Sequence, residues 1–153
     1  MIPLHDKQRC FYFFPHPVRV PLCHKFFIMT KEINILHVDD STTITSIIGE
    51  MLKGLASIGA IERAATCKTA KEIMQGKDID VVILDIDLPD GNGMELLRWI
   101  KSNHPSVRVF IFSNHADVFH RGYAKAYGAD HYFDKSTESD LLLNIFEPFN
   151  NKS

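Results

Sequence analysis

The sequence has few cysteines, no long apolar run and no large net charge. Three cysteines in 153 residues fit a reducing compartment better than a secreted scaffold held by disulfides. No stretch approaches the roughly 18 uncharged apolar residues that a membrane span needs. The pattern of a secretory signal peptide is also missing. We therefore expect a cytoplasmic protein without a membrane span, and the length allows one domain with a proper core.

Charge and proline are unevenly distributed along the chain. Residues 1–28 carry a net charge of +3 and four prolines, so −5 remains for residues 29–153 when +3 is subtracted from the total of −2. We expect residues 1–28 to be a disordered extension or the product of a misassigned start. The folded domain is expected at 29–147, with a short tail at 148–153. An acidic body argues against a general nucleic-acid surface, which needs clustered Lys and Arg.

One short apolar run ends at an acid. Val81–Leu84 is mostly β-branched and too short for a helix, which predicts a strand buried on both faces. Asp85 follows it directly, then Asp87, then the turn sequence Leu88-Pro89-Asp90-Gly91, and Asn92 is suited to cap the next helix. Asp85 is either the polar residue that ends a strand or a functional acid, because ligands bind at the carboxyl ends of strands in open parallel sheets.

The pattern of a strand that ends at a polar residue recurs. We expect strands at 33–38, 60–64, 81–84, 107–112 and 131–133. We expect helices from 41 or 42 to 55, at 66–76, 94–102 and 116–127, and from 137 or 139 to 146. This alternation predicts an α/β fold, with a five-stranded parallel sheet flanked by five helices. All strand ends then face one way, which places polar residues from four strands along one edge: Asp39, Asp40, Asp85, Ser113 and Lys135.

Such an edge has a specific chemistry. Carboxylates about 5 Å apart repel by roughly 3 kcal/mol per pair at an effective dielectric near 20, so three of them need a cation. Oxygen ligands that leave water positions open suit Mg²⁺ that also receives a phosphate. Lys135 can neutralise part of the charge, and Ser113 can donate a hydrogen bond to a phosphoryl oxygen. Carboxylate nucleophiles that form aspartyl phosphates need this arrangement. Taken singly, Asp39-Asp40 and Ser113 are better explained as helix caps, and Lys135 as a solvated side chain.

Taken together, the residues resemble a known family. The order DD, then D at the exit of a buried strand followed by LPDGNG, then S and K after later strands, is similar to the receiver domain of two-component response regulators over residues 31–147. The resemblance implies a flavodoxin-like three-layer sandwich with strand order 2-1-3-4-5. It also implies a stand-alone, chemotaxis-regulator-like switch rather than a turnover enzyme. Its partners would be a histidine kinase or phosphotransfer protein and a downstream protein, or a second copy in a homodimer.

The resemblance assigns roles to the acids. Asp85 matches the phosphoacceptor. Asp40 matches the direct Mg²⁺ ligand, Asp39 a ligand that acts through water, and the backbone carbonyl of Asp87 a further ligand. Asp87 and His115 also occupy variable positions that are thought to tune dephosphorylation.

The resemblance also covers the switch, with two departures. Ser113 matches the switch hydroxyl, Tyr132 the switch aromatic and Lys135 the lysine that contacts phosphate. Ser136 stands where the family usually has proline, often after a cis bond, so either a non-proline cis bond is kept or the loop differs. Asn114 is larger than the residue that usually follows the hydroxyl, and could crowd access to the phosphoacceptor.

Two other functions are compatible with parts of the sequence. VVILDID, which ends at Asp87, also resembles the nucleophile motif of haloacid dehalogenase-like phosphatases. That family places its motif on the first strand and has a cap domain, whereas here an earlier strand precedes it. The second alternative is a scaffold of receiver fold that binds without phosphorylation, because Ser136 and Asn114 could prevent switching.

One aromatic stripe is a candidate for either core or surface. Phe119, Tyr123 and Tyr127 are four residues apart on one expected helix. We expect this stripe to pack against the sheet, and the alternative is a surface for a protein partner.

Overall fold

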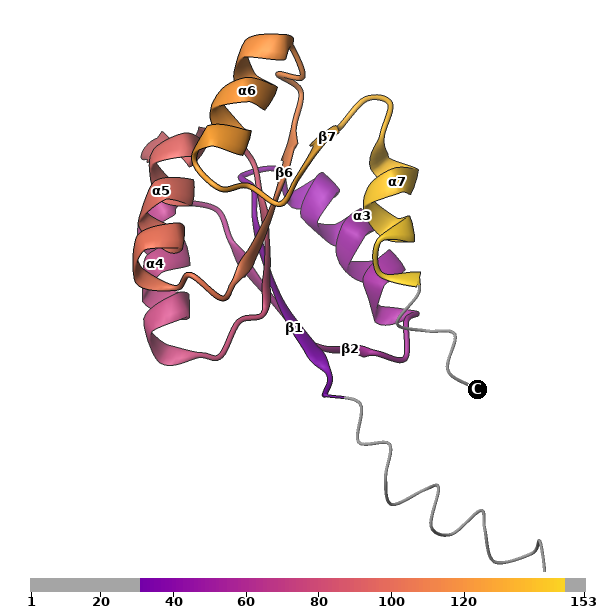
Figure 1. Cartoon of the computed structure of the whole chain (residues 1–153). Helices are drawn as coiled ribbons and strands as arrows, with labels where there is room; N and C mark the ends of the chain where they lie inside the picture. Colours follow the sequence, from indigo (N-terminus) through magenta and orange to yellow (C-terminus); the bar gives the residue numbers. More distant parts are fainter. Residues whose placement is uncertain (1–30, 148–153) are drawn as a thin grey trace, which may run out of the picture. The chain divides into compact units, whose positions relative to one another are not determined.

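The computed structural model describes residues 31–147, which form one parallel sheet covered by helices (Figure 1). Five strands lie in the order β2-β1-β3-β6-β7. They are β1 (Ile33–Val38), β2 (Ile58–Ala64), β3 (Val81–Leu84), β6 (Arg108–Ser113) and β7 (His131–Asp134). Counted along the chain, this is the order 2-1-3-4-5, so the expected fold class is confirmed. The expectations for residues 1–28 and for the tail at 148–153 concern segments outside the described residues.

Helices cover both faces of the sheet. They are α3 (Thr42–Lys53), α4 (Cys67–Gly76), α5 (Gly93–Asn103), α6 (Val118–Ala126) and α7 (Ser139–Asn144). In Figure 1, α3 and α7 lie on one side of the sheet and α4 and α5 on the other. None of the helices within residues 31–147 has the length and apolar character needed to cross a membrane.

The core lies in two layers, one on each face of the sheet. Along β1, Leu36 and Val38 belong to the layer that contains residues of α4 and α5. Ile33 and Ile35 belong to the layer that contains residues of α3 and α7. Side chains alternate between the two faces of a strand, so the next residue of this second series, His37, also lies on the α3 and α7 side.

Three of the five expected helix starts are confirmed by their caps. The side chain of Ser41 accepts a hydrogen bond from Ile44 N, and that of Thr66 accepts one from Thr69 N. Asn92 Oδ1 accepts one from Met94 N at 2.7 Å. These bonds satisfy backbone donors that have no partner within the helix.

Most of the boundaries differ from the expected ones by one or two residues. Strand β2 begins at Ile58, two residues before the expected start. Helix α7 ends at Asn144, although the apolar pattern predicted a helix through Phe146. Phe146 N donates instead to Leu143 O, in a tighter turn, and the Phe146 ring is fully buried in the core. The apolar spacing therefore identified the buried residue correctly and the backbone conformation wrongly.

The expectation that the aromatic stripe packs against the sheet was wrong. Phe119 is 77% exposed and Tyr123 is 59% exposed. The rings of Tyr123 and Tyr127 stack on each other, with centroids 6.3 Å apart. The single residue of α6 that is buried is Ala124, whose small side chain faces the core. The stripe therefore forms an apolar surface on α6.

Candidate functional site

The carboxyl ends of four strands carry the polar residues that the sequence predicted at one edge. Backbone hydrogen bonds continue the sheet one residue beyond the strands. Asp39 N donates to Ala64 O and Asp85 N to Val38 O, each at 2.9 Å, and Lys135 N donates to Ser113 O at 3.1 Å. The prediction of a shared edge is therefore confirmed.

Three carboxylates and one ammonium converge at this edge. One carboxylate oxygen from each of Asp39, Asp40 and Asp85 lies within 4.8 Å of the others. Asp39 and Asp85 are buried, and Asp40 is exposed. Lys135 Nζ lies 2.6 Å from Asp39 Oδ2 and 2.7 Å from Asp85 Oδ2, so it bridges the two buried acids.

The second oxygen of each buried acid is fixed by the backbone. Asp39 Oδ1 accepts a hydrogen bond from Ser41 N at 2.8 Å, and Asp85 Oδ1 accepts one from Ile86 N at 2.7 Å. Burial lowers the pKa of Lys135, but its hydrogen bonds to the two carboxylates, and their charges, outweigh this and raise it overall. The lysine therefore stays charged.

The charges at this edge do not balance. Three carboxylates face one ammonium, which leaves two negative charges uncompensated. The ligand atoms are oxygens only, and one acid, Asp40, is open to solvent. This set fits a hard divalent cation such as Mg²⁺, which is bound through one or two carboxylates and keeps several waters.

The loop after Asp85 is held close by a glycine. A Cβ atom at Gly93 would lie 2.1 Å from Asp85 O and 2.8 Å from Ile86 Cα, so no other residue fits. Gly93 N donates to Ile86 O at 2.7 Å. Helix α5 therefore begins directly against the backbone of the acid.

The same loop is tied to a neighbouring helix. It forms a two-stranded antiparallel ribbon, β4 (Asp87–Leu88) and β5 (Gly91–Asn92), which the sequence did not predict. At its tip, Asp90 accepts hydrogen bonds from Cys67 N at 2.7 Å and Lys68 N at 2.9 Å. These bonds, from Lys68 N and Cys67 N, cap α4 from outside and are the main reason that the pKa of Asp90 is lowered.

Ser113 and Tyr132 meet at the backbone of His115. Ser113 is fully buried at the end of β6, and its hydroxyl accepts a hydrogen bond from His115 N at 3.3 Å. The Tyr132 hydroxyl donates to His115 O. Partial burial raises the pKa of Tyr132 to about 12, so its hydroxyl stays protonated. The loop between β6 and α6 is therefore bonded both to the hydroxyl of β6 and to the aromatic residue of β7.

An exposed contact between two polar side chains joins this loop to the ribbon. His115 Nε2 lies 2.8 Å from Asp87 Oδ2. The His115 ring also stacks on His120, with centroids 5.3 Å apart. Asn114 is exposed. Asp87 and His115, which correspond to variable positions of the family that the sequence resembles, are thus direct neighbours in space.

The loop after Lys135 does not use a cis peptide. Every peptide bond in residues 31–147 is trans. Ser136 N donates to Asp134 Oδ1 at 2.7 Å, and Ser139 Oγ donates to Lys135 O at 3.0 Å. The sequence allowed either a non-proline cis bond or a loop of different conformation. The loop adopts the second, with trans peptide bonds, and its own side chains stabilise it.

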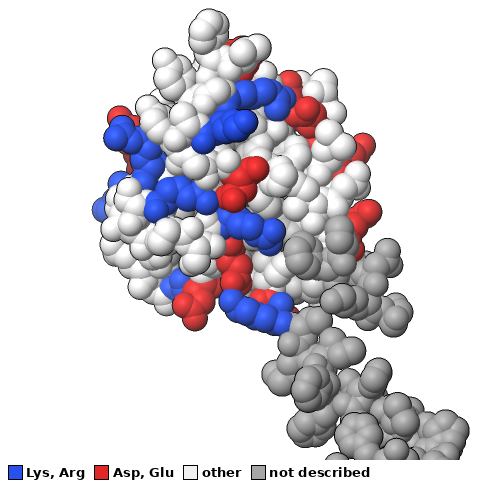
Figure 2. Space-filling view, in the orientation of Figure 1, with Lys and Arg blue, Asp and Glu red and all other residues white. Residues whose placement is uncertain are grey.

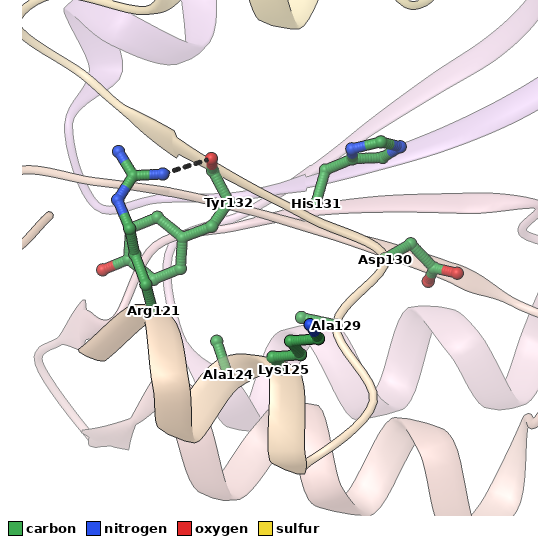
Figure 3. A pocket seen from close by; sticks show the side chains of 7 residues that line it. All are labelled: Arg121, Ala124, Lys125, Ala129, Asp130, His131 and Tyr132. Atoms are coloured by element: carbon green, nitrogen blue, oxygen red, sulfur yellow. Dashed lines mark hydrogen bonds between the residues drawn. The ribbon is translucent and has the colours of Figure 1, made fainter. Parts of the chain in front are cut away.

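Arg121 is a residue that sequence reasoning missed. Its Nη1 donates to Tyr132 O at 3.0 Å, and its guanidinium lies 5.0 Å from the centroid of the Tyr132 ring. Its Nη2 donates to Glu138 Oε2 at 2.8 Å. Figure 3 shows Arg121 reaching from α6 to β7 at a pocket of about 330 Å³ that is also lined by Lys125 and His131. No sequence signal distinguishes it, because its partners lie 11 and 17 residues away.

A buried histidine lies behind the acids. His37 is 1% exposed, and within residues 31–147 neither ring nitrogen has a hydrogen-bond partner. Its Nε2 lies 3.9 Å from Asp39 Oδ2. Burial, with the charges of Lys135 and Arg63, lowers the pKa of His37 to about 4. The sequence showed this residue only as an interruption of an apolar strand.

Charged side chains of both signs are mixed on the face of the molecule that Figure 2 draws. Figure 2 shows Lys and Arg side chains alternating there with Asp and Glu side chains. Neither sign forms a broad area on this face.

Comparison with known proteins supports one family. The family model described as the response regulator receiver domain matches residues 35–147. The Fimbriae Z protein of Salmonella typhimurium is 27% identical over 114 residues, which cover 74% of this chain and 54% of that protein. A protein-glutamate methylesterase/protein-glutamine glutaminase of Paramagnetospirillum magneticum is 31% identical over 72% of this chain and 29% of its own. This chain therefore spans about half the length of these relatives or less.

Solved structures of receiver domains have the same fold as this chain. A CheY-like receiver domain protein from Methanospirillum hungatei superposes with a TM-score of 0.69 and 28% identity, covering 78% of this chain and 94% of that one. CheY4 of Vibrio cholerae, at 23% identity and a TM-score of 0.68, shares the fold over 78% of this chain and 99% of its own. Together with the family match over most of the chain, these findings show that the protein belongs to the response regulator receiver domains of two-component systems.

Proposed function

We propose that this domain accepts a phosphoryl group on Asp85 from a histidine kinase or phosphotransfer protein, with Mg²⁺, and thereby switches a surface that binds a protein partner. The observation that carries the proposal is the bridge of Lys135 between Asp39 and Asp85 beside the exposed acid Asp40. An ordinary structural ion pair does not need a third carboxylate. A site that holds a metal ion and a phosphoryl group does.

In the transfer step, a carboxylate oxygen of Asp85 forms a bond to phosphorus while the bond from phosphorus to the donor's imidazole nitrogen breaks. The electron pair of that bond stays on the imidazole. Mg²⁺, when bound, neutralises charge on the phosphoryl oxygens. Asp40, Asp39 and the backbone carbonyl of Asp87 would hold it, with Asp39 acting through water. Lys135 turns from the carboxylates toward a phosphoryl oxygen, and its charge offsets the added negative charge.

The switch begins at Ser113. Its hydroxyl accepts from His115 N in the structure described here, and it would donate to a phosphoryl oxygen after transfer. Losing that contact frees the loop before α6, and the Tyr132 hydroxyl, bonded to the same loop, follows it. Because Arg121 bonds to the backbone of Tyr132, the movement of β7 reaches α6.

The output surface is formed by α6, β7 and α7. Its exposed apolar residues are those of the aromatic stripe together with Val118, which is 83% exposed, and Leu141 of α7, which is 52% exposed. Contiguous exposed apolar residues mark protein interaction sites. The partner is a downstream protein or a second copy of the domain. We infer that the domain acts in the cytoplasm as a switch that turns over no substrate. In this it would differ from the relatives that are named as methylesterases.

The test is the intact mass of the full chain after mixing with Mg²⁺ and acetyl phosphate. The wild-type protein should gain one phosphoryl group that disappears with time. Asp85→Asn should gain none, and neither should wild type in EDTA. Asp78→Asn is the matched control, because it removes a carboxylate that is exposed and is not one of the three clustered acids.

Two results would redirect the proposal. An adduct that persists in Asp85→Asn would place the phosphoryl group elsewhere. No adduct from acetyl phosphate or from a panel of phosphorylated histidine kinases, together with unchanged partner binding in Asp85→Asn, would establish a scaffold that works without phosphorylation. Sustained turnover of a phosphate ester would instead support the phosphatase alternative.

A further inference from the structure

We propose that His37 is a positioning residue of the acid cluster: its ring donates a hydrogen bond to Asp39 Oδ2 once Lys135 has been drawn away from that oxygen. The inference rests on the proposed function, since the bound cation and the phosphoryl group are what move the lysine. It adds a residue to which neither the sequence pattern nor the family match assigns a role.

The placement of His37 follows from the strand that carries it. Asp39 directly follows β1, two residues beyond His37, and its backbone N continues the sheet by donating to Ala64 O, so both side chains lie on the same face of the sheet. His37 is paired in register with Ile83 on β3 and with Arg63 on β2. Asp85 likewise lies two residues beyond Ile83, which is the β3 residue that pairs with His37. His37 therefore lies directly behind the two buried acids, on the side away from solvent.

The ring is unsatisfied in the resting arrangement. Within the described part of the chain, both nitrogens of His37 are buried without a hydrogen-bond partner. A neutral imidazole always carries one N–H donor, and an unpaired buried donor is destabilising. An apolar residue at this position would fill the same space without that cost. Buried polar groups without partners are rare in native proteins, and a functional role is one reason for keeping them.

The nearest group that can relieve the ring is Asp39. Its Oδ2 is 3.9 Å from His37 Nε2, and a shift of about 1 Å would bring the two atoms to hydrogen-bond distance. In the resting state that oxygen is held by Lys135 at 2.6 Å. A divalent ion held by the carboxylates would repel the Lys135 ammonium, and a phosphoryl oxygen would attract it. Asp39 is then free to turn toward His37.

A carboxylate near a metal is oriented by the groups behind it. Such partners typically change metal affinity by 10- to 100-fold when they are removed. His37 would fix Asp39 by a bond that exists only in the loaded state. The resting protein therefore carries an unpaired donor, and the loaded protein gains its hydrogen bond.

The experiment compares three full-length variants by two measurements. The first is the melting temperature in EDTA by circular dichroism. The second is the Mg²⁺ dissociation constant by isothermal titration calorimetry. His37→Leu, of similar volume, should raise the melting temperature by roughly 4 °C or more, because it removes an unpaired buried donor. It should also weaken Mg²⁺ binding by about 10-fold or more.

Two further variants separate position from general stability. His37→Gln keeps an N–H donor near the place of Nε2, and should bind Mg²⁺ within about 3-fold of wild type, in line with a single retained hydrogen bond. Ser57→Ala removes the one buried hydroxyl in residues 31–147 that lacks a hydrogen-bond partner, at the opposite end of the sheet from the acids. It should raise the melting temperature and leave the Mg²⁺ dissociation constant unchanged.

His37→Leu is expected to raise the melting temperature and to weaken Mg²⁺ binding. A histidine with a purely structural role would not give this combination. A lower melting temperature in EDTA, or an unchanged Mg²⁺ dissociation constant, would overturn the inference. If wild type binds Mg²⁺ and accepts a phosphoryl group while His37→Leu binds Mg²⁺ equally well, only the role of His37 fails. If wild type does neither, the proposed function fails with it.

Discussion

Replacing Lys135 by methionine tests whether the lysine is what allows two buried acids to coexist. The change keeps the length of the side chain and removes its charge. Lys135 and its two partners are nearly buried, with side-chain exposures of 8% for the lysine, 0% for Asp39 and 9% for Asp85. Water therefore screens the remaining carboxylates poorly.

The magnitude follows from the geometry. The carboxylate oxygens of Asp39 and Asp85 lie within 4.8 Å of each other. At an effective dielectric near 20, two negative charges at that separation repel by roughly 3 kcal/mol. Removing one partner of a buried ion pair typically costs about 3 to 5 kcal/mol, which agrees. We expect Lys135→Met to lower the free energy of unfolding by about 3 kcal/mol in EDTA.

Mg²⁺ should reverse much of this loss. A ligand that binds only the folded state stabilises it by about 2.7 kcal/mol at 100 times its dissociation constant. The missing ammonium leaves more negative charge for the ion, so the stabilisation should be larger in the variant than in wild type. The assay is urea unfolding followed by circular dichroism, with EDTA and with Mg²⁺.

Lys101→Met is the control. Lys101 Nζ also lies 2.8 Å from a carboxylate, Asp130 Oδ2, but the two side chains are 21% and 34% exposed. Its loss should be about 1 kcal/mol or less, and Mg²⁺ should not restore it. Equal stability of Lys135→Met and wild type in EDTA would refute the idea that the lysine offsets the repulsion, as would a loss that Mg²⁺ leaves untouched.

Three further expectations concern the rest of the domain. Gly93→Ala should destabilise the fold by more than about 2 kcal/mol and abolish the mass gain from acetyl phosphate, because its Cβ would lie 2.1 Å from Asp85 O; a folded, phosphorylated variant would contradict this. Partial burial raises the pKa of Asp130, but hydrogen bonds from Lys101 and Val109 N lower it overall. Its stabilisation should therefore be present above the ordinary carboxyl value and fade as the pH falls below it, so the stability difference between wild type and Asp130→Asn in urea titrations should shrink from pH 5 to pH 3. Phe119→Ser should change the free energy of unfolding by less than about 0.5 kcal/mol, whereas Phe110→Ala, which is fully buried, should cost about 3 kcal/mol or more; similar losses in both would mean that the Phe119 ring is not exposed in solution.

The parts of the fold that sequence reasoning predicted are those with a continuous apolar signal. β1 and β3 have the expected bounds, because most of their residues are buried and apolar: β3 is an unbroken apolar run, and β1 is interrupted only by Asn34 and His37. The cluster of acids with Lys135 was predicted because parallel strands end at one edge. Strand β2 was the least certain element, since its surface is mixed and periodicity is weak there.

The parts that were missed depend on contacts between distant residues. Asp90 caps a helix that begins 23 residues earlier, which no local pattern shows. The period of Phe119, Tyr123 and Tyr127 indicates correctly that they share a side of α6. It contains no information on whether that side faces the sheet or the solvent. In the structure, α6 packs through the small Ala124 instead, so the aromatic side is exposed.

The shallow packing of α6 has a thermodynamic consequence. Of its residues only Ala124 is buried, whereas α5 buries five. Opening this helix therefore exposes little apolar surface, and its local unfolding should need much less free energy than global unfolding. Amide hydrogens of α6 should exchange earlier than those of α5. A helix so weakly held can be displaced by a modest difference in hydrogen bonding at its N-terminal loop, without disturbing the sheet on which the acids are mounted.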